Sequence, residues 1–323
     1  MCLIGLAIDV NRRFPLVVAA NRDEFFERPA SRLAWWSPGD GQPDVLSGRD
    51  LQSAGTWLGL TAQGRLALVT NVREPSRIDP AAPSRGQIVP EWLNSSEPTD
   101  RFWMRTALMG YNGFNLIAAD FRRGECFWAS NCGAHPVRLE RGVYGVSNAA
   151  LDTPWPKVDG LKAALRQALV ASSADASVDA LSARLFDTLA DRSTPHDGQL
   201  PSTGVPLDTE RMLASAFIRS PDMRYGTRCS TLIITERIKR HLVTHVLERS
   251  FSGIGGVALL RRATLKDWPP RYTDAQTFSP RENEPVSETE LPADAHADTA
   301  EKLVKRTRVR SLLKPEPKLK RRA

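Results

Sequence analysis

The cysteine at position 2 is the residue of this sequence with the clearest capacity for chemistry. Cys2 directly follows the initiator Met1, and its small side chain makes Met1 removable. The product would carry a thiol and a free α-amine on one residue. An α-amine has a pKa of about 7.7–8.0, so near neutral pH it can take the thiol proton and activate the sulfur as a nucleophile. The alternative is that Cys2 is only a small buried hydrophobe near a chain end, the common fate of a free cysteine.

Charged side chains are expected beside this thiol. Residues 1–8 and 14–20 are apolar runs joined by a polar turn at residues 11–13, a pattern that predicts a β-hairpin ending beside residue 2. The residues that follow the second run are Asn21, Arg22, Asp23 and Glu24. One cation and two carboxylates would then flank the thiol. The alternative is a solvated loop, because runs of charged residues usually lie on exposed surfaces.

Two asparagines end predicted strands further along the chain. Asn71 closes a hairpin over residues 55–71, and Asn148 closes a strand over residues 142–148. A side-chain amide at the end of a buried strand can donate to a developing oxyanion, and it can equally cap a turn. Arg228 stands at the entry of another predicted strand, where it could meet a carboxylate.

The elements that must position these residues follow from the spacing of apolar side chains. Helices are predicted at residues 158–171 and 178–190, where leucines recur on one face. Shorter helices are predicted near residues 87–93 and 100–108. Residues 25–50 contain several prolines and glycines and are predicted to be a loop.

Metal and cofactor chemistry is not indicated. The cysteines are too few and too widely spaced for a metal site or a disulfide framework, which favours a reducing compartment. His241 and His245 lie four apart in a predicted strand with no third ligand nearby, so we expect no metal and no cofactor. No phosphate-binding loop or serine nucleophile motif is present.

The positive charge of the sequence belongs to the end of the chain. The formal net charge is +7, and residues 301–323 contain ten Lys and Arg against two Glu, so residues 1–300 carry about −1. Residues 253–323 are predicted to be a disordered tail behind a domain of residues 1–252, with nucleic acid bound at most weakly by the basic end. There is neither a signal peptide nor an apolar run of membrane-spanning length, so a cytoplasmic protein is expected.

Six short motifs, in consistent order from residue 1 to about residue 252, resemble the NRDE family, which includes the eukaryotic transport and Golgi organisation proteins. The motifs are Asn-Arg-Asp-Glu (21–24), Gly-Thr-Trp-Leu-Gly (55–59), Tyr-Asn-Gly-Phe-Asn (111–115), Tyr-Gly-Val-Ser-Asn (144–148), Thr-Pro-Trp (153–155) and Tyr-Gly-Thr-Arg (225–228). The family is similar to the amino-terminal-nucleophile (Ntn) hydrolases, in particular the choloylglycine and penicillin V acylases. The resemblance implies an α+β fold, a four-layer αββα sandwich.

The resemblance also implies a role for each candidate residue. These roles are nucleophile for Cys2, orientation of thiol and amine for Arg22 and Asp23, oxyanion donor for Asn71, contact with the amine or substrate for Asn148, and late arginine for Arg228. Further substrate contacts are expected at Asn21, Glu24, Trp57 and Arg85. One departure from the acylases matters, because Arg22 and Asp23 are adjacent here and neighbours on a regular strand face opposite sides of the sheet.

Two classes of function follow. The first is a cysteine amide hydrolase that transfers an acyl group to Cys2 and then to water. The second is a non-enzymatic haem or lipid trafficking protein on the same fold, in which Arg22 or Arg228 meets a carboxylate and tryptophans supply apolar wall. The ligand would be a small-molecule amide in the first case and haem or a lipid in the second. The sequence does not indicate the oligomeric state.

Overall fold

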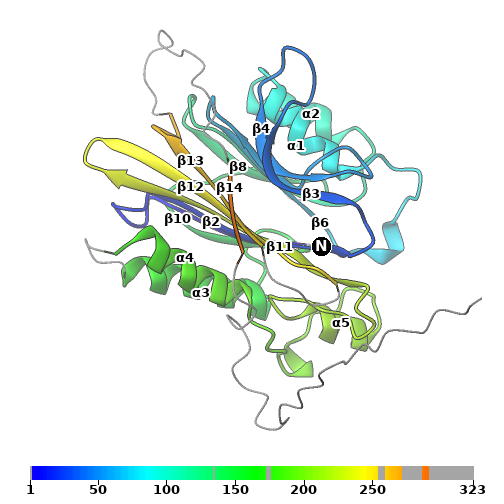
Figure 1. Cartoon of the computed structure of the whole chain (residues 1–323). Coiled ribbons are helices and arrows are strands. Elements are labelled where there is room, and N and C mark those ends of the chain that lie inside the picture. The colour runs from blue at the N-terminus through cyan, green and yellow to red at the C-terminus, as the bar shows by residue number, and fades with distance from the viewer. Residues whose placement is uncertain (1, 134, 172–175, 254–258, 271–285, 291–323) are drawn as a thin grey trace, which may run out of the picture.

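Among the described residues, the chain forms two antiparallel sheets of seven strands each (Figure 1). The computed structural model describes residues 2–133, 135–171, 176–253, 259–270 and 286–290. The strand order of the first sheet is β10 (Gly142–Val146), β1 (Cys2–Ile8), β2 (Leu16–Phe25), β11 (Tyr225–Ile238), β12 (His241–Ser250), β13 (Leu259–Lys266) and β14 (Ser287–Glu290). The order of the second is β3 (Ala30–Trp36), β4 (Val45–Asp50), β5 (Leu58–Thr61), β6 (Arg65–Asn71), β7 (Phe114–Asp120), β8 (Glu125–Ser130) and β9 (Val137–Arg138).

The predicted first hairpin is confirmed and lies inside the first sheet. Successive side chains of a strand point to opposite faces. Ile4 and Leu6 of β1 therefore enter the core between the two sheets, whereas Leu3 and Ala7 pack beneath helices on the outer face. Both faces of β1 are apolar because both are covered, which explains why the strand is a continuous apolar run rather than an alternating one.

Helices cover the outer face of each sheet. Helices α3 (Pro156–Val170) and α4 (Val178–Leu189) pack on the first sheet, where Leu161, Leu165 and Leu185 join its outer core. Helices α1 (Ile88–Asn94) and α2 (Thr99–Ala107) pack on the second sheet. The layers therefore run helix, sheet, sheet, helix, which confirms the α+β class, the four-layer αββα sandwich and the four predicted helices (Figure 1). Shorter segments are α5 (Leu207–Leu213), η1 (Pro75–Arg77), η2 (Arg85–Gln87) and η3 (Asp197–Gln199).

The loop predicted for residues 25–50 is wrong in part, because β3 and β4 form a hairpin there. The prolines and glycines that suggested a loop at residues 38–43 occupy the turn between the two strands. The alternation of β3 is hidden by a register shift between Ser31 and Ala34, and only Leu33 of this strand is fully buried. A strand at the edge of a sheet has fewer side chains to bury, so its sequence signal is weak.

Strand β13 lies beyond the predicted domain boundary at residue 252 and continues the first sheet, pairing with β12 from Val243 to Ser250. Ala263 and Leu265 of β13 enter the inter-sheet core. Trp268 follows, 2% exposed, and donates its indole N–H to the Thr61 carbonyl oxygen at 2.9 Å. The rest of the predicted tail, residues 271–285 and 291–323, lies outside the described residues.

Candidate active site

Cys2 is the first residue of β1 and faces the space between the sheets. It lies directly opposite Arg22 of β2, and directly opposed residues of an antiparallel pair share a face. The same alternation sends Ile4 and Leu6 into the inter-sheet core. The Cys2 carbonyl oxygen accepts a hydrogen bond from the Ser147 hydroxyl at 2.9 Å. The thiol is therefore held at the border of the core, in a side chain that is 9% exposed.

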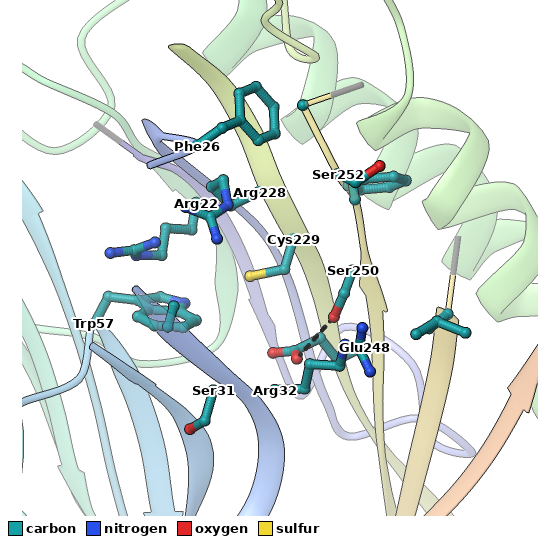
Figure 2. A pocket seen from close by; sticks show the side chains of 14 residues that line it. Arg22, Phe26, Ser31, Arg32, Trp57, Arg228, Cys229, Glu248, Ser250 and Ser252 are labelled. Atoms are coloured by element: carbon teal, nitrogen blue, oxygen red, sulfur yellow. Dashed lines mark hydrogen bonds between the residues drawn. The ribbon is translucent and has the colours of Figure 1, made fainter. Parts of the chain in front are cut away.

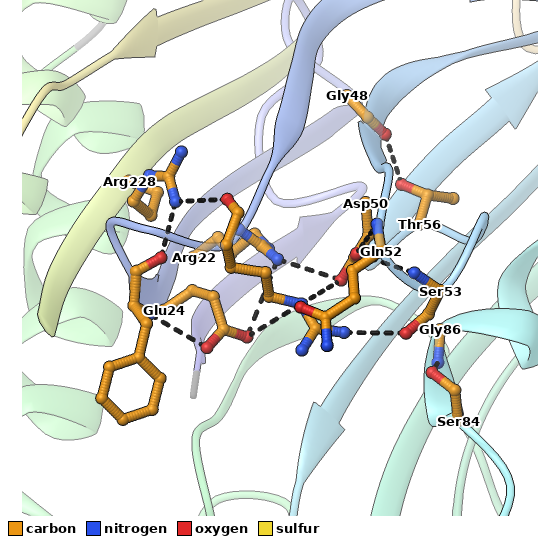
Figure 3. A network of polar contacts seen from close by, with 12 residues as sticks. Arg22, Glu24, Gly48, Asp50, Gln52, Ser53, Thr56, Ser84, Gly86 and Arg228 are labelled. Carbon is orange, nitrogen blue, oxygen red and sulfur yellow. Dashed lines mark hydrogen bonds and ion pairs between the residues drawn. The ribbon is translucent and has the colours of Figure 1, made fainter.

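Arg22 shares this face and is fixed by contacts from the second sheet. Strand β2 runs through the whole Asn-Arg-Asp-Glu motif, a point that the sequence left open. Arg22 and Asp23 therefore face opposite sides of the sheet. The Arg22 guanidinium carbon lies 4.4 Å from the centroid of the Trp57 ring, and its Nη2 lies 3.3 Å from the Asp50 carboxylate (Figure 3).

Asp23 lies on the helix side, behind the amino-terminal end of β1. Its carboxylate accepts a hydrogen bond from the Thr227 hydroxyl at 2.7 Å. Burial raises the pKa of Asp23, whereas the positive amino terminus and Lys157 lower it. Lys157 is itself buried and donates to the Leu213 carbonyl oxygen at 2.8 Å. Arg22 thus approaches the thiol on one face, and Asp23 acts on the amino terminus from the other.

The thiol is not activated by its surroundings alone. Burial raises the pKa of Cys2, the amino terminus lowers it, Asp23 raises it and Arg22 lowers it again. Burial is the largest of these effects, because a thiolate at the edge of the hydrophobic core loses its hydration. A base that takes the proton directly is therefore needed for nucleophilic chemistry at neutral pH.

Asn71 and Asn148 meet at the point where the second sheet crosses the end of β10. Asn148 donates its side-chain amide to the Asn71 carbonyl oxygen at 2.8 Å, and the Arg73 backbone N–H donates to the Asn148 carbonyl oxygen at 2.8 Å. Asn148 is therefore committed to holding the backbone of Asn71. Within the described part of the chain, the Asn71 side-chain amide has no hydrogen-bond partner, so it is free to serve as a donor.

Arg228 is aimed by a β-bulge. The register of β11 against β2 shifts between Thr227 and Cys229, and the extra residue is Arg228. Bulges bend a strand and redirect a side chain. Arg228 Nη1 donates to the carbonyl oxygens of Phe25 at 2.6 Å and Arg28 at 2.9 Å (Figure 3).

Asn21 lies on the helix face, away from the Cys2 thiol. Its amide donates to the carbonyl oxygens of Leu189 and Ala216, both at 2.8 Å, and its oxygen accepts from the Ser230 hydroxyl at 2.6 Å. These bonds tie β2 to the segments beside it. The structure therefore places Asn21 as an anchor of the strand rather than on the thiol face.

Glu24 and Arg85 lie close to the charged side of the site. Glu24 accepts the backbone N–H of the next residue at 2.9 Å, and its other oxygen lies 3.7 Å from Arg22 Nη2. Arg85 donates to the Gly113 carbonyl oxygen at 3.0 Å. Burial lowers the pKa of Arg85 and the charge of Cys2 raises it, so the guanidinium lies within electrostatic range of the thiol.

A pocket of about 290 Å³ adjoins Arg22 (Figure 2). Arg22, Trp57 and Arg228 line it, whereas Cys2 does not. Cys229 flanks Arg22 on the strand opposite to β1 and does line the pocket. The thiol and the pocket are therefore separated by the Arg22 side chain.

Sequence reasoning missed several residues of this region. Lys157 gave no signal, because a lysine in the first turn of an amphipathic helix is normally exposed. Asp50 was hidden inside the predicted loop. Cys229 and Glu248 belong to apolar strand segments, and only the pairing of β11 with β2 and β12 brings them beside Arg22.

The described residues contain no group of three or more His, Cys, Asp and Glu side chains that could hold a metal ion. His241 lies 2.8 Å from Asp267, and His245 lies 3.1 Å from Arg262, so the two histidines have different partners. None of the helices in the described ranges is both long and apolar enough to cross a bilayer.

Comparisons with known proteins agree with the sequence motifs. A solved structure of a Caenorhabditis elegans N-acylethanolamine-hydrolyzing acid amidase ortholog matches with a TM-score of 0.42 and 11% identity, covering 72% of this chain and 92% of that one. The Transport and Golgi organization protein 2 homolog of Bos taurus is 35% identical over 256 residues, which are 73% of this chain and 89% of that protein. The Drosophila melanogaster protein is 25% identical over 274 residues, covering 79% of this chain and 93% of that protein. A family model described as Transport and Golgi organisation 2 matches residues 1–252. The chain therefore belongs to the transport and Golgi organisation 2 family.

Proposed function

We propose that this protein is a cysteine amide hydrolase of the amino-terminal-nucleophile kind, active once Met1 has been removed. The observation that carries the proposal is the position of Cys2 at the end of β1, with Arg22 on the face of the thiol and Asp23 acting on the amino terminus from the opposite face. This arrangement supports a role for both Arg22 and Asp23 although they are adjacent in the sequence. The two side chains need not share a face, because the thiol and the α-amine are reached from different sides.

The reaction needs only Cys2 with its α-amine, Asn71, the amide substrate and one water molecule. The α-amine of Cys2 takes the thiol proton, and the sulfur attacks the carbonyl carbon of the amide. The carbonyl oxygen becomes an oxyanion, to which the free side-chain amide of Asn71 donates a hydrogen bond. The C–N bond then breaks, and the leaving amine takes the proton from the ammonium group. A water molecule cleaves the acyl thioester and regenerates the thiol, with the α-amine again holding the proton in transit.

Electrostatics give Arg22 and Asp23 different tasks in this scheme. Arg22 lowers the pKa of Cys2 against the larger opposing effect of burial, so it favours the thiolate. Asp23 orients the amine and stabilises the ammonium form that exists after proton transfer. Asn148 holds the backbone of the oxyanion donor rather than meeting the substrate.

Binding and transport of haem or a lipid remains a prediction that rests on the family resemblance. The pocket beside Arg22, about 290 Å³, is at the lower end of the volumes that hold drug-sized ligands, which favours a ligand smaller than haem.

The decisive experiment uses untagged protein made in cells. Intact mass first establishes whether Met1 is absent, and a thiol-reactive acylating probe is then added to wild type, Cys2→Ala and Cys132→Ala, whose native thiol is exposed. We expect mass loss of Met1 in all three proteins, because alanine at position 2 is as small as cysteine. We also expect one acyl group on Cys2 that is slowly lost to water; Cys132→Ala should keep this acyl group and Cys2→Ala should lack it, while the exposed Cys132 thiol is labelled in both proteins that contain it. Asn71→Ala should slow acylation by about 10²–10³-fold. Retention of Met1 in every preparation, or amide hydrolysis by Cys2→Ala, would refute the proposal.

A further inference from the structure

Apart from Arg22, the residues that build the pocket beside it have no part in the proposed thiol chemistry. It lies between the sheets, where β2, the start of β3, the bulge of β11 and the end of β12 converge (Figure 2). In the first sheet, Cys2 lies opposite Arg22 on one side and Cys229 lies opposite Arg22 on the other. Only Cys229 lines the pocket, so a ligand here would lie beyond Arg22 from the nucleophile.

The arginines of the pocket wall carry more positive charge than the neighbouring carboxylates neutralise. Arg22 and Arg28 lie between 2.7 and 3.9 Å from the carboxylates of Glu24 and Asp50 (Figure 3). Arg228, in contrast, forms no ion pair within the described ranges. Three arginines line the pocket, and Arg22 and Arg32 lie within 3.7 Å of a carboxylate of Asp50 or Glu288, so one positive charge is left over at Arg228.

Glu248 forms no ion pair with an arginine of the pocket among the described residues. Burial raises the pKa of this carboxyl group. Its two oxygens accept hydrogen bonds from the Leu33 backbone N–H at 2.8 Å and the Thr231 hydroxyl at 3.3 Å. Glu248 is therefore occupied by the strands around it rather than by an arginine of the pocket.

Arg228 presents an unused donor edge. Both carbonyl contacts of its guanidinium are made by Nη1, so the neighbouring edge formed by Nε and Nη2 has no hydrogen-bond partner among the residues described. Two parallel N–H groups on one edge match the two oxygens of a carboxylate. Arg22 has a second unpaired donor. Its side chain is 5% exposed, and its Nη1 is buried without a hydrogen-bond partner in the described part of the chain. A buried donor left unpaired is costly, and an anionic ligand would pair it.

Part of the wall is aromatic and limits the size of the ligand. Phe26, Trp57 and Phe251 line the pocket, and Arg228 itself lies over the Phe26 ring, 5.5 Å from its centroid. A volume of about 290 Å³ would hold roughly a dozen non-hydrogen atoms, by scaling from the cavity of about 150 Å³ that encloses benzene. The single surplus charge fits a monoanion better than a phosphate dianion.

We propose that this pocket binds a small amphiphilic monocarboxylate, with its carboxylate on the free edge of Arg228 and its apolar body against Phe26, Trp57 and Phe251. Binding does not need the nucleophile, so the inference goes beyond hydrolysis and stands or falls separately from it.

The test is calorimetric titration of the full chain with 4-phenylbutyrate, which has twelve non-hydrogen atoms, and with its neutral amide. Both titrations are repeated on Cys2→Ala to remove any reaction. We expect saturable binding of the carboxylate to both proteins, weakened by added salt, and binding of the amide at least tenfold weaker, because a hydrogen-bonded charge pair is lost.

Three variants locate the ligand. Arg228→Gln should weaken binding of the carboxylate by about tenfold to a hundredfold while binding of the amide changes little. Ser250→Phe adds a ring to the pocket wall without changing charge and should weaken binding of both ligands, which keeps the test valid if Arg228→Gln fails to fold. Arg224→Gln is the matched control, because Arg224 is exposed and pairs with Glu27 outside the pocket. The proposal is overturned by absence of saturable carboxylate binding to folded wild type, by equal affinity for the carboxylate and its amide, or by an Arg224→Gln effect as large as that of the pocket variants.

Discussion

Replacing Lys157 by Met should make the stability of the protein less dependent on pH. Lys157 is in the first turn of α3 and is buried behind Asp23, with its ammonium donating to the Leu213 carbonyl oxygen. Burial lowers the pKa of Lys157 from 10.5 to about 8, against the charge of Asp23, which raises it. Methionine has a similar length and no charge, so Lys157→Met removes the titration with little change of volume.

The magnitude follows from linkage between protonation and folding. The pKa of Lys157 is lower in the folded protein than in the unfolded chain, so between pH 8 and 10.5 the unfolded chain binds more protons and the free energy of unfolding rises with pH. Below about pH 8 both states are protonated and the folded protein carries the full cost, about 3 kcal/mol for a shift of about 2.5 pH units. From pH 7 to 9.5 the wild type should therefore gain about 2 kcal/mol relative to Lys157→Met.

Urea unfolding followed by circular dichroism at several pH values between 7 and 9.5 measures this difference. Lys266→Met is the control, because Lys266 is exposed at the end of β13 and its curve should stay parallel to that of the wild type. Other titrating groups are common to all three proteins and cancel in the comparison. Wild-type and Lys157→Met curves that stay parallel within about 0.5 kcal/mol would refute the electrostatic account of Lys157 and of its action on Asp23.

Three further predictions test other parts of the structure. Gly55→Ala should destabilise the protein by about 1–3 kcal/mol in urea unfolding, because the added Cβ would overlap the Gly86 carbonyl group of η2; wild-type stability would contradict that close approach. Trp268→Ala should cost about 3–5 kcal/mol, whereas Leu108→Ala, at an 86% exposed position, should cost almost nothing; equal effects would remove β13 and its flank from the domain. Burial raises the pKa of Cys126 to about 12, so at pH 8 iodoacetamide should label the exposed Cys132 in mass spectrometric mapping and leave Cys126 unlabelled until urea is added; comparable labelling rates in the folded protein would disprove this.

Local periodicity was enough to predict the first hairpin and the helices, whereas the four layers and the roles of the site residues were implied by the family resemblance. The two apolar runs at the start predict the hairpin, and a hairpin of that length places Arg22 opposite Cys2. The leucine stripes predict α3 and α4 because a helix of this kind must bury one face. A strand that ends on a polar amide is also a local pattern, and it led to Asn71.

Partners distant in the chain decided the rest. The sequence of β3 and β13 does not alternate clearly, because an edge strand or a strand with charged neighbours buries few side chains, so only pairing with β4 and β12 identifies them. The electrostatic contacts of the site also depend on residues far apart in the sequence. Asp23 comes from a strand and Lys157 from a helix, and they are buried together because α3 packs on the first sheet.

The sequence by itself determined the first hairpin, the helices with their buried faces, and Cys2 as the candidate nucleophile. Tertiary structure alone decided that β2 continues through Asp23 and that a bulge turns Arg228 into the pocket. It also decided that the Arg228 guanidinium has no carboxylate partner among the described residues. The physical reason is the distance along the chain over which each interaction acts. Side-chain periodicity is set within a few residues, whereas register shifts, ion pairs and desolvation depend on which strands and helices meet in three dimensions.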